Sequence, residues 1–506
     1  MHPRKLVRDT IGFAFTQYVA RALLMLRGVL AARLLGPNSY GAWNAIQLVC
    51  DYGAYFHLGT QQGLDQAVPA HLVDQDANRL RRLLRSGLFN AIVLPILFGL
   101  GGILYFSRST GAIRTTWGMR GVTVAYVSVL LVTVSNVFLT VLRSYGRIRV
   151  VSEWFLLQAI VATGLGLALI PWQGAWGLLW GWVAANLLAL IFARWRAPVT
   201  VPVRPAYSPD SLMLIRAGLP MLLYLTSALV MRTVDRIVIL KFAGTQALGY
   251  YSLGVMALTL LLYLPDSISY VLYPQLLRGY RESGDVPAAI RPRAQRAIQT
   301  VSAVVPGLCG LAFLGARDAV LVALPNFGPG VSALRVLCFG AAGLAVAGLS
   351  SIVLMTLRRQ TLLIPAALFA TALGAGLDTF VLRAGAGIDG VAWATFATYV
   401  IHGAVMLFLA MMALGADVGA RLREIARVYA PLAIALVLVV LLDRYLPWRG
   451  TLVPALRWSR LALSELGFAA LYVAFAYPLV RGLGLRVLAE ELLIRRMGRR
   501  VTEPVA

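Results

Sequence analysis

Residues 32–43 read ARLLGPNSYGAW, and residues 240–251 read LKFAGTQALGYY. At a constant offset of 208 residues, Gly36 matches Gly244 and Gly41 matches Gly249. Each stretch lies between two long apolar runs, so each is expected to form a tight turn between antiparallel helices. Glycine suits such a turn because it permits a positive φ or a close approach of two backbones. The four glycines therefore predict equivalent turns in an internal repeat.

The composition around these turns is that of a membrane protein. The chain has 506 residues, of which 59% are hydrophobic and only 13% are charged, and its mean hydropathy is +0.76. Apolar runs of roughly 18 residues or more recur from end to end, as spanning helices require. We predict an all-α polytopic membrane protein with about 14 transmembrane helices. The predicted spans are residues 10–35, 40–63, 86–107, 121–142, 150–171, 174–193, 213–240, 245–277, 297–316, 330–356, 361–382, 388–413, 427–446 and 460–480.

The basic residues predict the orientation of these spans. Of the 46 Lys and Arg, 30 fall in the two termini and the even-numbered loops, 11 in the odd-numbered loops and 5 within spans. The positive-inside rule then places both termini in the cytoplasm. The loops that fit least well are those with Arg108, Arg114 and Arg120 and with the basic residues of 444–460. The net charge of +25 belongs to this pattern, and no nucleic-acid partner is predicted.

The repeat extends beyond the turns. Residues 174–177 (GAWG) open the sixth span, and residues 387–390 (GIDG) open the twelfth, at an offset of 213. Spans 1–6 and 7–12 are therefore predicted to form two parallel repeats, an architecture typical of transporters. The predicted organisation is an N-lobe at 1–193, a cytoplasmic linker at 194–212, a C-lobe at 213–413, two extra spans at 414–480, and a basic amphipathic tail at 481–506.

The run from Arg33 to Gly41 resembles the turn between spans 1 and 2 of polysaccharide flippases of the MOP (MATE-like) superfamily. Val234-Asp235-Arg236, the glycines that follow, and the 387–390 turn are similar too. The resemblance covers about residues 10–480. It implies a V-shaped pair of six-helix bundles around a central cavity lined by spans 1, 2, 7 and 8, with two extra C-terminal spans.

The same resemblance implies a function. Such flippases move undecaprenyl-pyrophosphate-linked oligosaccharides, or similar polyprenyl-linked intermediates, from the inner to the outer leaflet of the bacterial cytoplasmic membrane for cell-surface polysaccharide biosynthesis. The expected partners are this lipid-linked substrate, membrane lipids, and the polysaccharide polymerase and chain-length machinery.

Four arginines within spans are predicted to make the cavity cationic. They are Arg21 and Arg27 in the first span and Arg232 and Arg236 in the seventh. Positions 232, 235 and 236 are expected to share one helical face, and a guanidinium can pair two phosphate oxygens at once. The alternatives are that Arg236 pairs with Asp235 and that Arg21 or Arg27 snorkels, because about 120° separates these two on the helix.

Acidic residues within spans are candidates for charge balance or for binding a coupling cation. They are Asp51, Asp235, Asp266 and Asp378. Structural pairing is the alternative reading of each. The cysteines Cys50, Cys309 and Cys338 are isolated, and neither a metal site nor another cofactor is predicted.

Three functions compete. A lipid-linked oligosaccharide flippase working by alternating access predicts a cationic cavity and no catalytic loop. A cation-coupled multidrug or small-molecule exporter of the same superfamily would favour acids over arginines in the cavity. A membrane enzyme, such as a polymerase or ligase acting on lipid-linked sugars, would need a large outer loop with paired carboxylates or a catalytic histidine. The sequence contains no such loop and no nucleotide-binding motif, so a transporter and not an enzyme is predicted.

Overall fold

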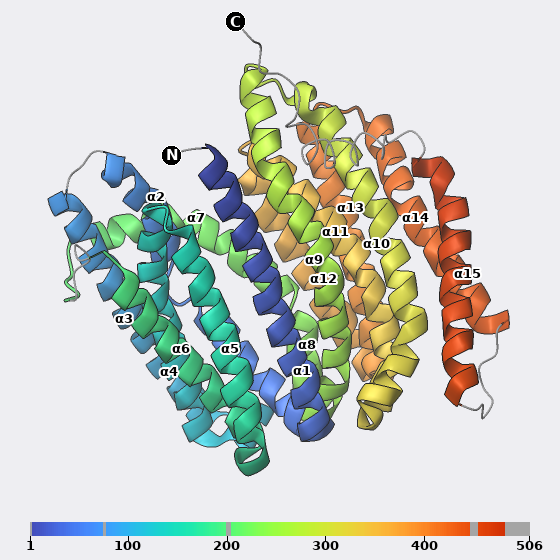
Figure 1. Cartoon of the computed structure of the whole chain (residues 1–506), viewed down its shortest axis with the longest axis horizontal. Coiled ribbons are helices and arrows are strands. Elements are labelled where there is room, and N and C mark those ends of the chain that lie inside the picture. The colour runs from blue at the N-terminus through green and yellow to red at the C-terminus, as the bar shows by residue number, and fades with distance from the viewer. Residues whose placement is uncertain (1–2, 74–76, 199–203, 446–453, 481–506) are drawn as a thin grey trace, which may run out of the picture. The chain divides into compact units, whose positions relative to one another are not determined.

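A computed structural model describes residues 3–73, 77–198, 204–445 and 454–480 (Figure 1). Within these residues the chain is helical and contains no strand. The α-helices are α1 (Pro3–Gly53), α2 (Thr60–Val73), α3 (Ala77–Arg108), α4 (Ala112–Ser144), α5 (Ile148–Gln173), α6 (Ala175–Arg196), α7 (Asp210–Met231), α8 (Val234–Phe242), α9 (Gly244–Glu282), α10 (Pro287–Ala323), α11 (Val331–Thr356), α12 (Leu363–Arg383), α13 (Gly387–Ala413), α14 (Val418–Tyr445) and α15 (Pro454–Val480). Two short 3-10 helices, η1 (Pro325–Gly330) and η2 (Gln360–Leu362), complete the described elements, and the predicted tail at 481–506 lies outside the described residues.

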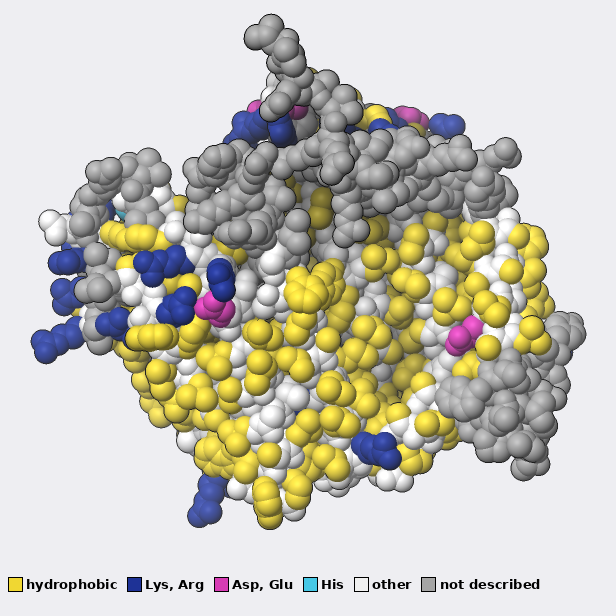
Figure 2. All heavy atoms as spheres, viewed as in Figure 1, with side chains coloured by type: hydrophobic (Ala, Val, Ile, Leu, Met, Phe, Trp, Pro, Cys, Tyr) yellow, Lys and Arg dark blue, Asp and Glu magenta, His cyan; other side chains and the backbone are white. Residues whose placement is uncertain are grey.

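The helices have the length and surface that a bilayer demands. Among the described residues, 11 helices are long and apolar enough to cross a membrane. Many large apolar side chains are exposed, including Phe380 at 70% and Val440 at 60%, as expected where lipid replaces water. Figure 2 shows hydrophobic side chains covering most of the visible face, with arginine and lysine gathered near α2 and α3. The prediction of an all-α polytopic membrane protein is confirmed.

The first predicted turn is a sharp bend inside α1. Gly36 has φ 72° and ψ 173°, and Pro37 follows it directly. The two arms of α1 correspond to the first predicted span and to most of the second. Gly244, which separates α8 from α9, has φ 82°. Both matching glycines therefore adopt the left-handed region that residues with a Cβ rarely adopt.

Two predicted spans are broken where the sequence predicted continuous helices. The second span, 40–63, is interrupted by turns at residues 54–59 between α1 and α2. The seventh, 213–240, is interrupted at residues 232–233 between α7 and α8. Neither interruption contains a proline. Side chains of the interrupted segments themselves satisfy freed backbone groups, as described below.

Packing divides the chain into two compact units. Unit 1 contains residues 1–256, 320–330 and 378–388, and unit 2 contains residues 257–319, 331–377 and 389–506. The two units are defined by packing contacts, whereas the predicted lobes are defined by the internal repeat. The lobe boundaries therefore stay a prediction.

In unit 1, α4 runs parallel to the second arm of α1 and to α2. Trp117 Nε1 donates to the carbonyl of Ala42 at 2.8 Å, and Thr140 Oγ1 donates to Asp65 Oδ1 at 2.7 Å. The residue offset is 75 in both contacts, so the two segments stay in register and point the same way. This matches the prediction that spans 2 and 4 cross the membrane in the same direction. The core beneath them is mainly aliphatic and includes Leu64, with Phe138 and Trp154 also among its members.

In unit 2, α11 is the central helix, since 83% of its most apolar window is buried. The two C-terminal helices are attached to α10 by polar contacts. Gln299 Nε2 donates to Glu424 Oε1 on α14 at 2.6 Å, and Tyr472 OH on α15 donates to the carbonyl of Ala303 at 2.6 Å. These hydrogen bonds are buried, and a buried donor or acceptor is costly to leave unpaired. Helices α14 and α15 are thus integral parts of unit 2.

Candidate functional site at two broken helices

The break between α1 and α2 is held by a histidine and by glycines. His57 is buried, and its Nδ1 accepts the backbone N–H of Gly59 at 3.1 Å. Gly59 has φ 87° and lies against the backbone of Gly218 on α7, where an added Cβ would come within 2.7 Å of a carbonyl carbon. The break therefore needs a glycine for its conformation and for the close approach of α7. It also brings the start of α2 beside α7.

The break between α7 and α8 is held by a threonine. Thr233 Oγ1 donates to the carbonyl of Leu229 at 2.8 Å, which satisfies one of the carbonyls exposed where α7 ends. The hydroxyls of Tyr52 and Thr233 are 2.5 Å apart, so a hydrogen bond joins the two breaks. Spans 2 and 7 are thus interrupted at places that touch each other within unit 1. Discontinuous spanning helices of this kind form ion and substrate sites in transporters.

Asp235 stands in the first turn of α8 and is only 2% exposed. Its Oδ1 accepts the backbone N–H of Arg236 at 2.7 Å, and its Oδ2 accepts the hydroxyl of Tyr251 on α9 at 2.7 Å. Both carboxylate oxygens are therefore engaged. A carboxylate at a helix N-terminus is also favoured by the helix dipole. These contacts make Asp235 a residue that fixes α8 against α9.

Arg236 is half-buried and is incompletely satisfied. Its Nη2 reaches the carbonyl of Arg232 at 3.4 Å, while its Nε is buried without a hydrogen-bond partner among the described residues. Its charge acts on the carboxyls of Asp51 and Asp235. Asp51 lies in the last turn of α1, where its Oδ1 accepts Gln47 Nε2 at 3.0 Å. Two basic side chains, Arg232 and Arg236, and two acidic ones, Asp51 and Asp235, thus lie around the breaks.

Arg232 is exposed at the end of α7, whereas Asp235 is buried. The expectation that positions 232, 235 and 236 share one helical face is wrong, because the helix is interrupted between 232 and 234. The break instead separates Arg232 from Arg236 and lets the two guanidinium groups leave the backbone from different helices. Tyr55 lies within reach of the charges of both Arg232 and Asp51.

Arg27 occupies an aromatic cage on α1. Its Cζ lies 5.4 Å from the ring centroid of Trp43 and 5.2 Å from that of Trp182. Both distances are in the cation–π range. Its Nη1 is buried and has no hydrogen-bond partner among the described residues. The cage therefore holds a guanidinium in place while leaving one of its donors unused.

Two of the four turn glycines, Gly41 and Gly249, meet in a reciprocal contact. A Cβ added at Gly41 would collide with the carbonyl oxygen of Thr245, and one added at Gly249 would collide with that of Pro37. Thr245 is Pro37 shifted by the same 208 residues that relate Gly41 to Gly249. Each half therefore offers the same stretch to the other, as in a two-fold symmetric interface. Phe327 adds edge-on ring contacts with Tyr40 and with Tyr250, both at 6.1 Å between centroids.

A comparison with known families identifies the family of the chain. A family model described as "Polysaccharide biosynthesis protein" matches residues 29–326, which is more than half of the chain. The chain belongs to this polysaccharide biosynthesis family. No curated protein matches the sequence.

Solved structures of other proteins show which fold this chain has. The structure described as lipid II flippase MurJ in an inward closed conformation has a TM-score of 0.70 at 13% identity, covering 94% of this chain and 99% of that chain. An inward-facing multidrug resistance MATE family transporter of the MOP superfamily has a TM-score of 0.61 at 15% identity, covering 80% of this chain and 96% of that one. A MOP superfamily transporter from Pyrococcus furiosus gives 0.58 at 16%, covering 81% and 95%. The polysaccharide biosynthesis protein thus has the fold of MOP-superfamily transporters, and the predicted resemblance is confirmed.

The remaining predicted residues lie elsewhere along the chain. Arg21 is half-buried on α1, six residues before Arg27. Asp378 is 1% exposed near the end of α12, and Asp266 is exposed on α9 in unit 2. In the described part of the chain, no three His, Cys, Asp or Glu side chains are grouped as metal ligands.

Sequence reasoning missed several residues that build the site in this family member. Thr233, which holds one break, and Trp182, which closes the cage, were not singled out. Gln47 was missed as well. One signal was available: Thr233 followed by Asp235 is typical of the start of a helix, and it lay inside a predicted span.

Proposed function

We propose that this protein translocates an anionic lipid-linked oligosaccharide from the inner to the outer leaflet of a bacterial cytoplasmic membrane. The observation that carries the proposal is the placement of arginines at the broken helices. Arg232 and Arg236 flank the interruption of span 7, and Arg27 is caged on span 1 with an unused donor. All three belong to unit 1 of a member of a polysaccharide biosynthesis family.

The chemistry fits a diphosphate. A pyrophosphate linking a polyprenyl chain to a sugar carries several charged oxygens, and each guanidinium can pair two of them. A buried donor without a partner costs about 1–3 kcal/mol. The Nε of Arg236 and the Nη1 of Arg27 carry this cost in the present conformation. An anionic group that reached these donors would remove it, which favours binding of phosphate oxygens.

The acidic side chains would balance the charge of the arginines when no substrate is bound. An isolated cation in hydrocarbon is expensive, so a partner is needed when no substrate is bound. The charge of Arg236 acts on the carboxyl of Asp51, which makes Asp51 the candidate for this role. Asp235 is less available, since both of its oxygens already accept hydrogen bonds. We propose that Asp51 releases Arg236 to the substrate and pairs with it again after transport.

Alternating access supplies the movement. The substrate's sugars would pass through the cavity while its lipid chain stays in the bilayer. Polyprenyl-linked substrates of the undecaprenyl-pyrophosphate type, both termini in the cytoplasm, and cooperation with a polysaccharide polymerase and chain-length machinery belong to the same proposal. The protein would act as a transporter and perform no bond chemistry on the substrate.

A complementation experiment tests the proposal. Arg27→Ala, Arg232→Ala and Arg236→Ala are introduced singly in a host whose surface polymer requires this protein, and polymer and membrane expression are measured together. Each guanidinium contact is worth about 1.5–3 kcal/mol, so we expect a roughly tenfold or greater loss of polymer at unchanged expression. Arg236→Lys should restore part of the polymer, because it keeps the charge and loses the fork.

Arg278→Ala is the matched control. Arg278 pairs with Glu282 in an exposed i,i+4 contact, and its loss should leave polymer unchanged. Normal polymer in all three test variants at normal expression would refute the cationic site. Loss of polymer in Asp51→Asn together with full polymer in the arginine variants would place the essential charge on the acid and not on the arginines.

A further inference from the structure

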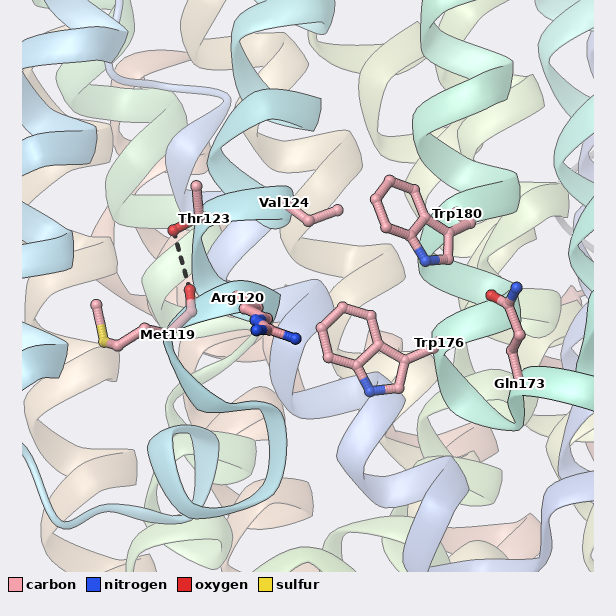
Figure 3. Close-up of a pocket in the computed structure, with 7 residues that line it drawn as sticks. All are labelled: Met119, Arg120, Thr123, Val124, Gln173, Trp176 and Trp180. Atoms are coloured by element: carbon pink, nitrogen blue, oxygen red, sulfur yellow. Dashed lines mark hydrogen bonds between the residues drawn. The ribbon is translucent and has the colours of Figure 1, made fainter.

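A second site lies between α4 and α6. It is a pocket of about 760 Å³, open to the surface. Figure 3 shows Arg120 on α4 extending toward the ring of Trp176 on α6, with Trp180 in the next turn of that helix and Gln173 beyond Trp176. The lining is completed by Met119, Thr123 and Val124. None of these residues belongs to the broken-helix site.

The back of the pocket is rigid. Trp117 is 2% exposed and contacts Trp176 edge-on at 5.2 Å between ring centroids. Its Nε1 is anchored on the carbonyl of Ala42 at 2.8 Å. One tryptophan is therefore fixed by a buried hydrogen bond and in turn fixes the second. Ordered aromatic walls of this kind are typical of binding sites, because little rotamer freedom remains to be lost.

The pocket has a polar mouth and an apolar interior. Gln173 is the last residue of α5, at the α5–α6 connection, and Arg120 follows the bend at Gly118 in α4, on the side of the α3–α4 connection. Val124 lies one helical turn deeper than Arg120 on α4, and Trp180 lies one helical turn deeper than Trp176 on α6. Below them the surface stays apolar and exposed, for example at Val127 with 46%. This gradient matches a lipid, whose head group is polar and whose chains are not.

Charge selects the kind of head group. Arg120 is exposed and makes no ion pair with a described residue. Arg108 and Arg114 belong to the same connection, which is the one that fits the positive-inside pattern poorly. The positive-inside rule does not explain arginines in this connection, so we look for a ligand that they could bind. A guanidinium beside tryptophan rings at the membrane boundary favours an anionic phosphate with hydroxyl groups attached.

We propose that this pocket binds the head group of an anionic membrane phospholipid. Arg120 pairs with the phosphate oxygens, Gln173 hydrogen-bonds the head-group hydroxyls, and Trp176 and Trp180 flank the glycerol region and the upper acyl chains. The pocket lies at the end of the spans next to the Gly36 bend, to which Trp117 is tied through Ala42. With cytoplasmic termini, this end faces the outer leaflet.

Native mass spectrometry of the full-length protein tests the site. The protein is released from nanodiscs that contain phosphatidylglycerol in a phosphatidylcholine background, and retained phosphatidylglycerol is counted. We expect Arg120→Ala to weaken retention of one phosphatidylglycerol molecule by roughly tenfold or more, and Arg120→Lys to weaken it less. Arg108→Ala is the matched control, since Arg108 is exposed at the same connection but does not line the pocket.

Quenching of tryptophan fluorescence by brominated phosphatidylglycerol gives an independent readout. Wild type should be quenched more than Trp180→Phe, and Arg120→Ala should reduce quenching in the wild-type background. Equal retention in Arg120→Ala and wild type would overturn the proposal. Equal losses in Arg120→Ala and Arg108→Ala would overturn it as well, because they would indicate a diffuse interfacial belt. Preferential retention of a polyprenyl phosphate would overturn the assignment to a membrane phospholipid. None of these readouts depends on polymer transport.

Discussion

At the scale of the residue, a charged side chain inside a span indicates that it faces either a partner or a cavity. The sequence does not distinguish between the two. The sequence predicted Asp235 and Arg236 as neighbours in a cavity-lining helix. The structure gives them different tasks, because Asp235 is saturated by Tyr251 and a backbone N–H while Arg236 keeps a donor unused. Such assignments depend on distances between helices, which hydropathy and spacing do not contain. Trp182 illustrates the same limit, because an aromatic residue in a span is equally typical of packing and of an interfacial belt.

The contact of Asp235 with α9 yields a prediction about stability. Tyr251→Phe removes the hydroxyl that donates to Oδ2 and leaves a buried carboxylate oxygen without that partner. We expect a loss of about 1–3 kcal/mol, seen as a lower Tm of the purified protein in detergent. Tyr250→Phe is the neighbouring control. The Tyr250 hydroxyl only accepts an exposed hydrogen bond from Gln246 at 3.3 Å, so the Tm should be unchanged. Equal shifts in the two variants would contradict the role assigned to Asp235.

At the scale of the element, apolar runs predicted most helices well, and the turn glycines predicted where chains reverse. The two breaks were not predicted, and the reason is physical. In a soluble protein a break leaves polar residues at the surface, whereas here Thr233 and His57, which belong to the breaks themselves, satisfy nearby backbone groups. The segment 54–59 (AYFHLG) is therefore as apolar as a helix, and hydropathy passes over it.

The reciprocal glycine contact makes a prediction about one of these elements. Gly41→Ala places a Cβ against the carbonyl of Thr245, with rigid backbone on both sides, and we expect sharply reduced folded protein in the membrane. Gly101→Ala on α3 is the control. No atom lies within 4 Å of a Cβ at that position, so this change should be neutral or stabilising by about 0.4–1 kcal/mol. The measurement is size-exclusion chromatography of a fluorescent fusion, with Tm for whatever elutes as a single species. Wild-type yield and Tm for Gly41→Ala would show that the contact tolerates side chains.

At the scale of the whole molecule, the sequence predicted the all-helical membrane fold, and the family match and the similar transporter structures confirm it. The distribution of Lys and Arg contributes the orientation, which is a property of the chain as a whole rather than of any one site. The parallel register of α4 with α1 and α2 agrees with the alternation of loops on which that orientation rests.

Cysteine accessibility tests the orientation. Ser109, between α3 and α4, is predicted to face outward, and Ser283, between α9 and α10, is predicted to face the cytoplasm. Ser109→Cys should react with a membrane-impermeant maleimide in intact cells, whereas Ser283→Cys should react only after permeabilisation. The native Cys50, Cys309 and Cys338 are buried and give little background. The opposite labelling pattern would invert the predicted topology.

The glycine contact also constrains how the protein can move. Pro37–Gly41 and Thr245–Gly249 pack backbone against backbone, so moving either stretch away from the other breaks the contact of both. The same movement breaks the hydrogen bond from Thr245 to Asn38. We therefore expect the contact at this end of the spans to form or break in one cooperative step that involves both copies of the repeated sequence.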